Sequence, residues 1–325
     1  MAEPTKIGVV AGGTSGEFEV SMRSAAMIMD NVDRSLFDPY LMVINEEGWY
    51  AYLGEKRFKI NKGDFSFGKG DDKVQVEGCF IIIHGSPGEN GILQGYFKLI
   101  GMPHTTGDVF NMGLTFNKVA TNNILRSSGF NTAKNMLIRR KDHYSSSEIS
   151  MELGMPVFVK PNQGGSSIAT SKVTAKEGLH SAIDLALEAD DEVILEQFVE
   201  GTEVTCGVIR KDGEITPLPP TEIVPHTDFF DYEAKYSGKS DEITPARIGD
   251  GMTARIQELS VRIFDQLNCR GMIRVDYIIQ DGVPHVVEVN TVPGFSPESI
   301  IPQQAEAAGI SKKELISIVL ESLTF

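Results

Sequence analysis

One stretch near the C-terminal end of the sequence constrains the fold most, because apolar and polar residues alternate there in two runs on either side of Gln280-Asp-Gly282. Successive side chains of a β-strand point to opposite faces, so Arg274 and Asp276 share one face of the first run. Glu288 and Asn290 share one face of the second run by the same rule. The pattern predicts two strands of a hairpin, each with an apolar and a polar face.

The length of the connecting loop decides whether the two polar pairs meet. A three-residue loop at Asp281–Val283 sets Asp276 opposite Glu288, whereas a two-residue loop places the pairs on opposite faces. We expect the longer loop, because its glycine can adopt the left-handed conformation that such a loop requires. Two carboxylates and an amide oxygen on one patch are ligands that Mg²⁺ prefers, with substrate phosphates completing its octahedron. A solvated polar face on a half-buried sheet is the alternative.

Composition excludes several classes of partner. The chain has 325 residues, which predicts about two domains, and it carries 30 Lys and Arg against 45 Asp and Glu, a net charge of −15. Such a charge repels nucleic acid and anionic membranes, so we expect neither as a partner. The three cysteines, Cys79, Cys206 and Cys269, form no metal-binding or disulfide pattern. No apolar run reaches the ~20 residues that span a bilayer, and a cytoplasmic protein is expected.

The N-terminal part reads as a parallel α/β layer. Lys6–Ala11, Tyr40–Ile44 and Cys79–Ile83 are apolar runs typical of buried strands, and apolar residues recur at helical spacing from Val20 to Met29. Gly63–Lys73 is rich in Gly, Lys and Asp and reads as an exposed loop. The turn after the first strand, residues 11–16, resembles a dinucleotide-binding motif. Its first glycine is replaced by Ala11, which leaves a nicotinamide-linked oxidoreductase only as a minor alternative.

The remainder alternates strands and helices. The periodicity predicts helices over Asn117–Arg126, Gly178–Glu188 and Lys312–Leu323, and strands over Asn135–Ile138, Val157–Lys160 and Glu192–Glu196. Changes in pattern near residues 104 and 195 divide the chain into three parts, 1–104, 105–195 and 196–325.

Two lysines stand where a nucleotide could be held. Lys118 begins a predicted helix, and Lys160 ends a predicted strand just before Gly164-Gly-Ser-Ser167. A glycine loop of this kind can bring backbone N–H groups against phosphate oxygens, while each lysine supplies a point charge. No P-loop is present, so the phosphates must be held in another way.

Six motifs, in order, resemble the ATP-grasp superfamily and, within it, the D-alanine–D-alanine ligases. The motifs are GGTSGEFEVSMRSA (12–25), HGSPGENGILQG (84–95), VKPNQGGSSIATSKV (159–173), LEQFVEGTEVTCGV (195–208), FFDYEAKY (229–236) and RVDY…VEVNTVPGFSPESIIP (274–302). The resemblance covers nearly the whole chain. It implies an ATP-grasp fold preceded by a Rossmann-like N-terminal domain. Of the three parts, residues 1–104 would be this substrate domain, 105–195 the central ATP-grasp sub-domain and 196–325 the C-terminal catalytic sub-domain.

The resemblance also implies residue roles. For the amino-acid substrates, the implied residues are Glu17 and His84 at the first D-alanine and Lys235 and Ser299 at the second. For the nucleotide they are Lys118, Lys160, Ser166, Ser167, Glu196, Gln197, Phe198, Val199, Glu203 and Lys235. Ser166, Tyr236 and Glu17 form a triad that closes a mobile loop, Arg274 and the N–H of Gly294 stabilise the oxyanion, and Asp276, Glu288 and Asn290 bind two Mg²⁺.

The implied activity is ATP- and Mg²⁺-dependent formation of D-alanyl-D-alanine through a D-alanyl phosphate, for peptidoglycan precursor synthesis, by a homodimer. A D-alanine–D-lactate or D-alanine–D-serine ligase is the closest alternative, and Tyr236 favours the D-alanine users. A catalytically idle ATP-binding protein remains a further alternative. The sequence departs from the family pattern at Asn90, Asn117, Ala169 and Gln197, while the implied metal and oxyanion residues are retained.

Overall fold

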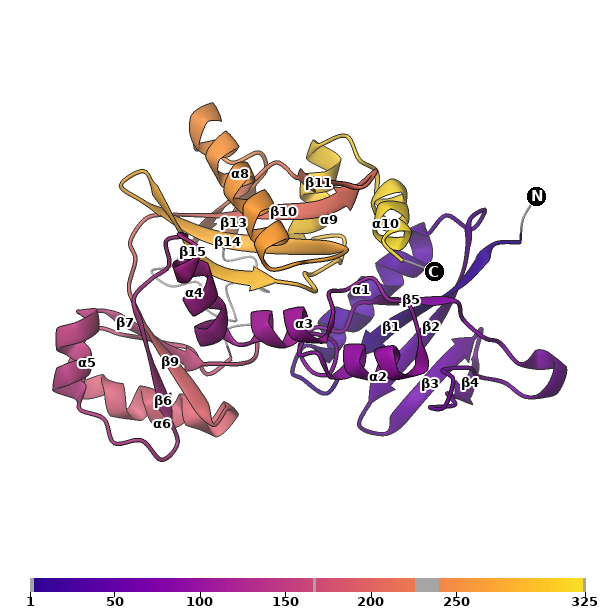
Figure 1. Ribbon diagram of the computed structural model, residues 1–325, viewed down its shortest axis with the longest axis horizontal. Coiled ribbons are helices and arrows are strands. Elements are labelled where there is room, and N and C mark those ends of the chain that lie inside the picture. The colour runs from indigo at the N-terminus through magenta and orange to yellow at the C-terminus, as the bar shows by residue number, and fades with distance from the viewer. Residues whose placement is uncertain (1–2, 166–167, 226–239, 324–325) are drawn as a thin grey trace.

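The computed structural model describes residues 3–165, 168–225 and 240–323. The described strands form three separate sheets, of five, four and six strands. In Figure 1 the five-stranded sheet lies at the right, the four-stranded sheet at the lower left, and the six-stranded sheet above them. Among these described residues, no helix is long and apolar enough to cross a membrane.

The N-terminal sheet has the order β4-β3-β2-β1-β5. Its strands are β1 (Thr5–Gly12), β2 (Phe37–Asn45), β3 (Gly48–Leu53), β4 (Lys56–Lys59) and β5 (Gly78–Ile81), and α1 (Phe18–Asn31) connects the first two. β1 pairs in parallel with both β2 and β5, which confirms the predicted parallel layer. The segment Gly63–Lys73, with the short 3₁₀ turn η1 (Gly70–Asp72), differs from the prediction because Phe65 and Phe67 are buried in the core beneath this sheet.

The four-stranded sheet is antiparallel, in the order β6-β9-β7-β8. Its strands are β6 (Asn135–Arg139), β7 (Val157–Pro161), β8 (Ser171–Val173) and β9 (Glu192–Gln197). The helices α5 (Ser146–Leu153) and α6 (Leu179–Ala189), with the 3₁₀ turn η2 (Lys176–Gly178), supply apolar side chains to the core of this unit. All but β8 and α5 among its main elements were expected from the sequence.

The six-stranded sheet is also antiparallel, with β13-β12-β10-β14-β15 in order and β11 beside β10. Its strands are β10 (Thr202–Lys211), β11 (Glu214–Pro217), β12 (Thr221–Pro225), β13 (Ser240–Ile243), β14 (Met272–Gln280) and β15 (Val283–Asn290). Helix α8 (Asp250–Gln266) lies between β13 and β14 in the sequence, and α9 (Ile300–Ala307) and α10 (Lys312–Glu321) follow β15.

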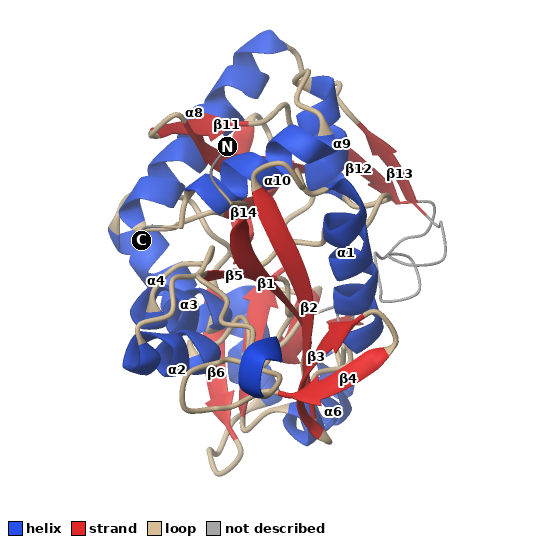
Figure 2. Cartoon of the chain, turned by 90° about the vertical axis from the view of Figure 1, so that its right-hand side faces the viewer, coloured by secondary structure: helices blue, strands red, loops and turns tan. Residues whose placement is uncertain are grey.

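Three helices, α2 (Ile92–Ile100), α3 (Val109–Phe116) and α4 (Lys118–Ser127), connect the first sheet to the second. The C-terminal helix returns to the N-terminal sheet, where Leu315, Ile316 and Val319 join a core that contains Ile7 and Val9 of β1. Figure 2 shows α10 above α1 in agreement with this packing. The two ends of the chain therefore share one hydrophobic core.

The β14–β15 hairpin has the predicted pairing but not the predicted loop. Asp276 faces Glu288, as expected, whereas the turn has only two residues, because Gln280 pairs with Val283. Both turn residues, Asp281 and Gly282, have positive φ (49° and 77°), the conformation of a type I′ turn that matches strand twist. The register then shifts by one residue next to Asp276, at a β-bulge. The bulge restores the facing pairs that a two-residue turn alone would separate.

Candidate active site

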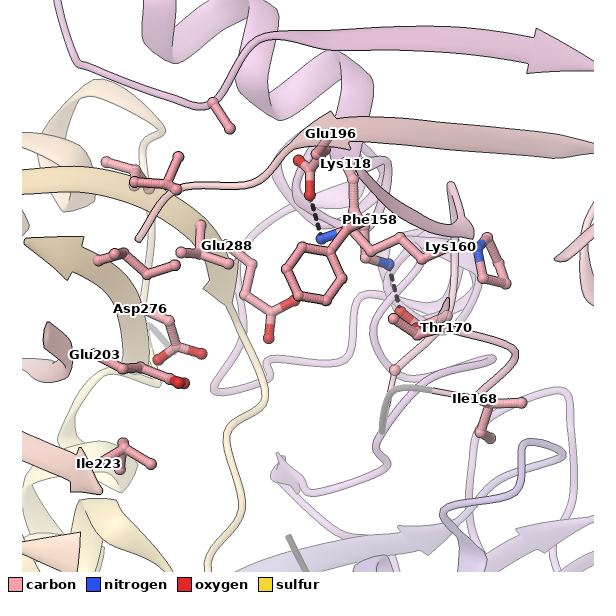
Figure 3. Close-up of a pocket in the computed structure, with 18 of the residues that line it drawn as sticks. Lys118, Phe158, Lys160, Ile168, Thr170, Glu196, Glu203, Ile223, Asp276 and Glu288 are labelled. Atoms are coloured by element: carbon pink, nitrogen blue, oxygen red, sulfur yellow. Dashed lines mark hydrogen bonds and ion pairs between the residues drawn. The ribbon is translucent and has the colours of Figure 1, made fainter. Parts of the chain in front are cut away.

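A cavity of about 880 Å³ is lined by residues from all three sheets and their loops (Figure 3). Ten of the residues singled out in the sequence line it, namely Glu17, Lys118, Lys160, Glu196, Gln197, Phe198, Val199, Glu203, Asp276 and Glu288. Segments that are far apart in the sequence therefore meet at one site. Phe158 and Ile223 add apolar surface to the same cavity.

The two lysines lie on one side of this cavity. Lys160 Nζ is 2.6 Å from Glu196 Oε2, and Asn122 Nδ2 donates to the other oxygen of Glu196 at 3.0 Å. Lys118 Nζ donates to the carbonyl oxygen of Gly164 at 2.7 Å. The dashed lines of Figure 3 mark the two lysine contacts. Lys118 is thus held against the glycine loop, and Lys160 is held against β9.

The pKa values of the two lysines are shifted in opposite directions. Burial, reinforced by the neighbouring Lys160 charge, lowers the pKa of Lys118 to about 8. Burial also acts to lower the pKa of Lys160, but the nearby carboxylates of Glu196 and Glu288 outweigh it, and the pKa of Lys160 is raised. Lys160 therefore stays cationic across the physiological range, while Lys118 is close to its titration point.

Asp276 is surrounded by donors on the floor of the cavity. Arg274 Nε and Nη2 each donate to one of its oxygens at 2.8 Å, and Asn290 Nδ2 donates to Oδ2 at 3.0 Å. Thr205 Oγ1 on β10 donates to Oδ1 at 2.5 Å. Burial alone lowers the pKa of Arg274, but the adjacent Asp276 outweighs it and raises the pKa above its usual range. These contacts fix the carboxylate in one orientation.

The donor set on the hairpin fits Mg²⁺. Asp276 and Glu288 are direct neighbours on adjacent strands, and Asn290 lies beside them on the same face. All three offer the hard oxygen ligands of Mg²⁺. Within residues 3–165, 168–225 and 240–323, no group of three or more His, Cys, Asp or Glu side chains could hold a metal by itself. A metal here needs oxygen ligands from a substrate to complete its shell.

Glu17 lines the cavity on the side of the N-terminal sheet, and His84 is the buried residue next to Gly85, which also lines it. Glu17 precedes α1, and a side chain added at Gly165 would come within 2.7 Å of its carboxylate, so the glycine loop lies directly against Glu17. His84 is buried, with Nδ1 2.7 Å from the carbonyl of Val292, and burial lowers its pKa. The imidazole thus links the N-terminal sheet to the loop after β15.

Gly294 and Ser299 lie against each other in this same loop. A Cβ at Gly294 would be 2.9 Å from Ser299 Oγ, and Ser299 is the residue immediately before α9. Ser296 donates its backbone N–H to Ser299 Oγ at 2.9 Å. The loop from β15 to α9 therefore presents a hydroxyl and a glycine backbone next to Arg274's strand.

Four residues named from the sequence, Ser166, Ser167, Lys235 and Tyr236, lie outside the described residues. Their proposed roles rest on the sequence alone.

Two of the sequence departures keep structural roles. Asn117 caps α4, because its side chain accepts the N–H of Ala120 at 2.9 Å. Ala169 has a φ of 53°, in the left-handed region that favours glycine, so it occupies a conformation that the family's usual glycine adopts without strain.

Sequence reasoning missed three residues that hold the site together. Glu89 accepts N–H groups from Gly85 (3.0 Å) and Val292 (3.2 Å), Asn122 orients Glu196, and Thr205 orients Asp276. Burial and the nearby Glu17 raise the pKa of Glu89 to about 7. Thr205 alone left a usable signal, because it shares a strand face with Glu203 two residues earlier.

Comparison with known proteins decides the family. Residues 6–107 match the family model for the N-terminus of D-ala D-ala ligase, and residues 124–321 match the model for its C-terminus. The chain belongs to the D-alanine–D-alanine ligase family. Enzymes of this family are ATP-dependent ligases, so the predicted enzyme class is confirmed, and the alternative of a nicotinamide-linked oxidoreductase is not supported.

Relatives of this family match the chain over nearly its whole length. The D-alanine–D-alanine ligase of Porphyromonas gingivalis (strain W83) is 45% identical over 317 residues, 97% of this chain and 96% of that protein. That of Flavobacterium johnsoniae is 42% identical over 97% and 98% of the two chains.

Solved structures of relatives share the fold. The VanG D-Ala:D-Ser ligase of Enterococcus faecalis superposes with a TM-score of 0.89 at 33% identity, covering 98% of this chain and 99% of that one. The D-alanine–D-alanine ligase of Bacillus anthracis in complex with ATP gives 0.79 at 27%, covering 98% and 97%. The predicted ATP-grasp fold behind a parallel N-terminal sheet is confirmed.

Proposed function

We propose that the protein ligates two molecules of D-alanine to D-alanyl-D-alanine, using ATP, for the synthesis of peptidoglycan precursors. The observation that carries the proposal is the single cavity in which Lys118 and Lys160 face the Asp276–Glu288 pair. Cations on one wall and paired carboxylates on the other suit a polyphosphate that arrives with a divalent metal. Family membership supports D-alanine as the amino acid.

The nucleotide would lie along the four-stranded sheet. Glu196 through Val199 line the cavity at the end of β9 and are proposed to hold the adenine, with Phe158 supplying an apolar wall. Glu203, which begins β10 nearby, is the proposed partner of the ribose hydroxyls. The lysines then meet the phosphates, together with Ser166, Ser167 and Lys235 outside the described residues.

Asp276, Glu288 and Asn290 are the residues that would hold the two proposed Mg²⁺ ions. Bound Mg²⁺ supplies Lewis-acid polarisation of phosphate oxygens and neutralises their charge. In this chain the fixed geometry of Asp276 and the flanking lysines prepares that charge environment before the nucleotide arrives.

Glu17 and His84 are proposed to hold the first D-alanine so that its carboxylate attacks the γ-phosphate, giving ADP and D-alanyl phosphate. Positioning contributes most of the catalysis in such a transfer. The acyl phosphate hydrolyses readily in water. The glycine loop against Glu17, together with Ser166 and Tyr236, is therefore proposed to close the site during this step.

The amine of the second D-alanine then attacks the acyl carbon, and phosphate leaves. The tetrahedral oxyanion requires preorganised donors, which we assign to Arg274 and the N–H of Gly294. Ser299 is proposed to bind the carboxylate of the second D-alanine together with Lys235. Its hydroxyl lies next to Gly294, because a Cβ added at that glycine would be 2.9 Å from Ser299 Oγ. In this assignment, the three parts 1–104, 105–195 and 196–325 each contribute one group of residues to the cleft.

A homodimer in the cytoplasm completes the proposal. The side chains of Ile92, Leu99 and Phe110, on the neighbouring helices α2 and α3, are 62%, 87% and 72% exposed. An apolar group of this kind on a highly charged protein is a candidate contact between two copies. The three buried free cysteines suit a reducing compartment.

The test is phosphate release from MgATP with D-alanine, D-serine, D-lactate and L-alanine in turn. Release with D-alanine and formation of the dipeptide are expected. D-Serine is an informative arm, because the E. faecalis relative is a D-Ala:D-Ser ligase. Preference for D-serine or D-lactate at neutral pH would overturn the second substrate, and absence of release with every D-amino acid would overturn the ligase function.

A further inference from the structure

Helix α9 is attached to the six-stranded sheet by a buried amide. Gln304 is fully buried, and its Oε1 accepts the backbone N–H of Gly207 on β10 at 2.8 Å. Its Nε2 donates to the carbonyl of Thr205 at 2.9 Å and to the hydroxyl of Thr221 on β12 at 3.0 Å. One side chain therefore joins α9, β10 and β12, through both of its amide N–H donors and its carbonyl oxygen.

The sheet needs this amide because β10 changes partners at this point. Val208 pairs with Pro217 of β11, and Thr205 pairs with Thr221 of β12. Between these two pairs, the carbonyl of Gly207 accepts the backbone N–H of Leu218 at 2.8 Å, while the N–H of Gly207 donates to Gln304. Gln304 therefore supplies the acceptor for a backbone N–H at the point where one partner strand gives way to the other.

Gly207 permits the close approach of the helix. A Cβ at this position would lie 2.6 Å from both Gln304 Oε1 and Ile301 Cδ1, distances that real Cβ atoms do not show. The sequence of β10 thus leaves room for α9 at the place where the amide enters. Close packing and hydrogen bonding hold the helix at the same point, which leaves it little freedom to shift along the sheet.

The two ends of this connection both reach the site. Ser299 is the residue immediately before α9, the helix that carries Gln304. Thr205, whose carbonyl Gln304 holds, donates its hydroxyl to Asp276 at 2.5 Å. The amide therefore joins the helix that follows Ser299 to Thr205, the residue that orients Asp276.

We propose that Gln304 is a positioning residue for the second half-reaction, setting where the attacking D-alanine lies relative to the acyl phosphate. The inference rests on the proposed function, in which Ser299 binds the second D-alanine. A displacement of about 1 Å at such a site reduces rate by on the order of 100-fold. Loss of the amide should thus affect the second D-alanine far more than the first or ATP.

The experiment is steady-state kinetics of Gln304→Met, with separate KM values for ATP and for the two D-alanine sites. Methionine has a similar length but cannot hydrogen bond to Gly207 or Thr205. We expect the KM for the second D-alanine to rise about 10- to 100-fold, with the other two KM values within about twofold of wild type. Gln257→Met is the matched control, because Gln257 on α8 donates to the carbonyl of Leu218, beside Gly207, and makes no hydrogen bond to α9 within the described part of the chain.

A pH series with Gln304→Glu supplies a second test that does not depend on the folding of the methionine variant. The protonated carboxyl group can accept from Gly207 and donate to Thr205, whereas the carboxylate cannot donate. We expect the second KM, divided by the wild-type value at each pH, to rise as the carboxyl group ionises. A uniform rise in all three KM values, an equal effect of Gln257→Met, or a pH-independent ratio would overturn the inference. Wild-type protein without dipeptide synthesis would instead overturn the proposed function.

Discussion

The buried Lys160–Glu196 pair allows a quantitative test of the nucleotide side of the cavity. The two side chains are only 13% and 9% exposed, their charged atoms are 2.6 Å apart, and Asn122 satisfies the second carboxylate oxygen. Glu196→Gln keeps the shape of the side chain and removes one charge. It leaves Lys160 buried, beside the cation of Lys118, without its partner.

The cost follows from the burial of the pair. Removing one member of a buried ion pair costs about 3–5 kcal/mol, because the remaining charge is desolvated without compensation. The amide can still contact Asn122 and Lys160, so we take the lower end, a loss of about 3 kcal/mol in the free energy of unfolding. At about 1.5 °C per kcal/mol, which an unfolding entropy of about 2.1 cal/mol/K per residue gives for 325 residues, the expected fall in Tm is roughly 4–5 °C. A nucleotide at 100 times its Kd restores about 2.7 kcal/mol, since its phosphates are a new partner for Lys160.

Thermal unfolding with and without a non-hydrolysable MgATP analogue measures both quantities. The matched control is Asp191→Asn, which removes the exposed partner of Arg140 just before the same strand; the two side chains are 81% and 52% exposed. An exposed pair contributes about 0–1 kcal/mol, so the Tm of this control should fall by less than about 2 °C. Equal effects of the two substitutions would refute the claim that burial makes the Lys160–Glu196 pair strong.

Four other outcomes are expected. Burial and the charge of Lys160 lower the pKa of Lys118 to about 8, so its positive charge is lost as pH rises through that value. The KM for ATP should therefore rise above pH 8 in the wild-type protein but not in the Lys118→Arg variant. Parallel pH profiles of KM in the two proteins would contradict this assignment. Glu288→Gln should lower turnover at least about 100-fold and weaken Mn²⁺ binding seen by electron paramagnetic resonance, with an unchanged circular dichroism spectrum. Tyr277→Phe should destabilise the protein by about 1 kcal/mol in denaturant unfolding, because it removes the buried hydrogen bond to Ser260 (2.8 Å). Leu99→Glu should convert a dimer to a monomer in light scattering without loss of Tm; a dimer that persists would exclude the α2–α3 surface as the contact.

Local patterns predicted the elements that bury a continuous apolar face. The strands β1, β7, β9 and β14 and the helix α4 lie within a few residues of the expected positions. Short or irregular pieces were missed for a physical reason. The segment around Phe65 looks polar by composition, yet its aromatic side chain packs into the core because the strands beside it offer an apolar face.

The site shows the same division between local and distant information. Period-two alternation placed Arg274 with Asp276 and Glu288 with Asn290, since that property belongs to each strand alone. Whether the two pairs meet depends on the bulge, which the alternation does not encode. The contacts of Glu89 with Val292 and of Gln304 with Gly207 join residues about a hundred or more positions apart, and no local spacing encodes them. The resemblance to a family supplied the ligands' identities, which geometry alone leaves open.

The bulge in the β14–β15 hairpin means that this strand pair contains one residue more than regular pairing needs. Eleven residues lie between Asp276 and Glu288, whereas regular pairing around the two-residue turn accommodates ten, and the bulge takes up the extra residue, Val287. A deletion of Val287 should therefore leave a regular hairpin in which the two carboxylates still face each other. A deletion in β14 would keep that pairing only with the turn moved onto Gly282 and Val283, away from the two residues that adopt the type I′ conformation. One residue should therefore be lost more easily from β15 than from β14.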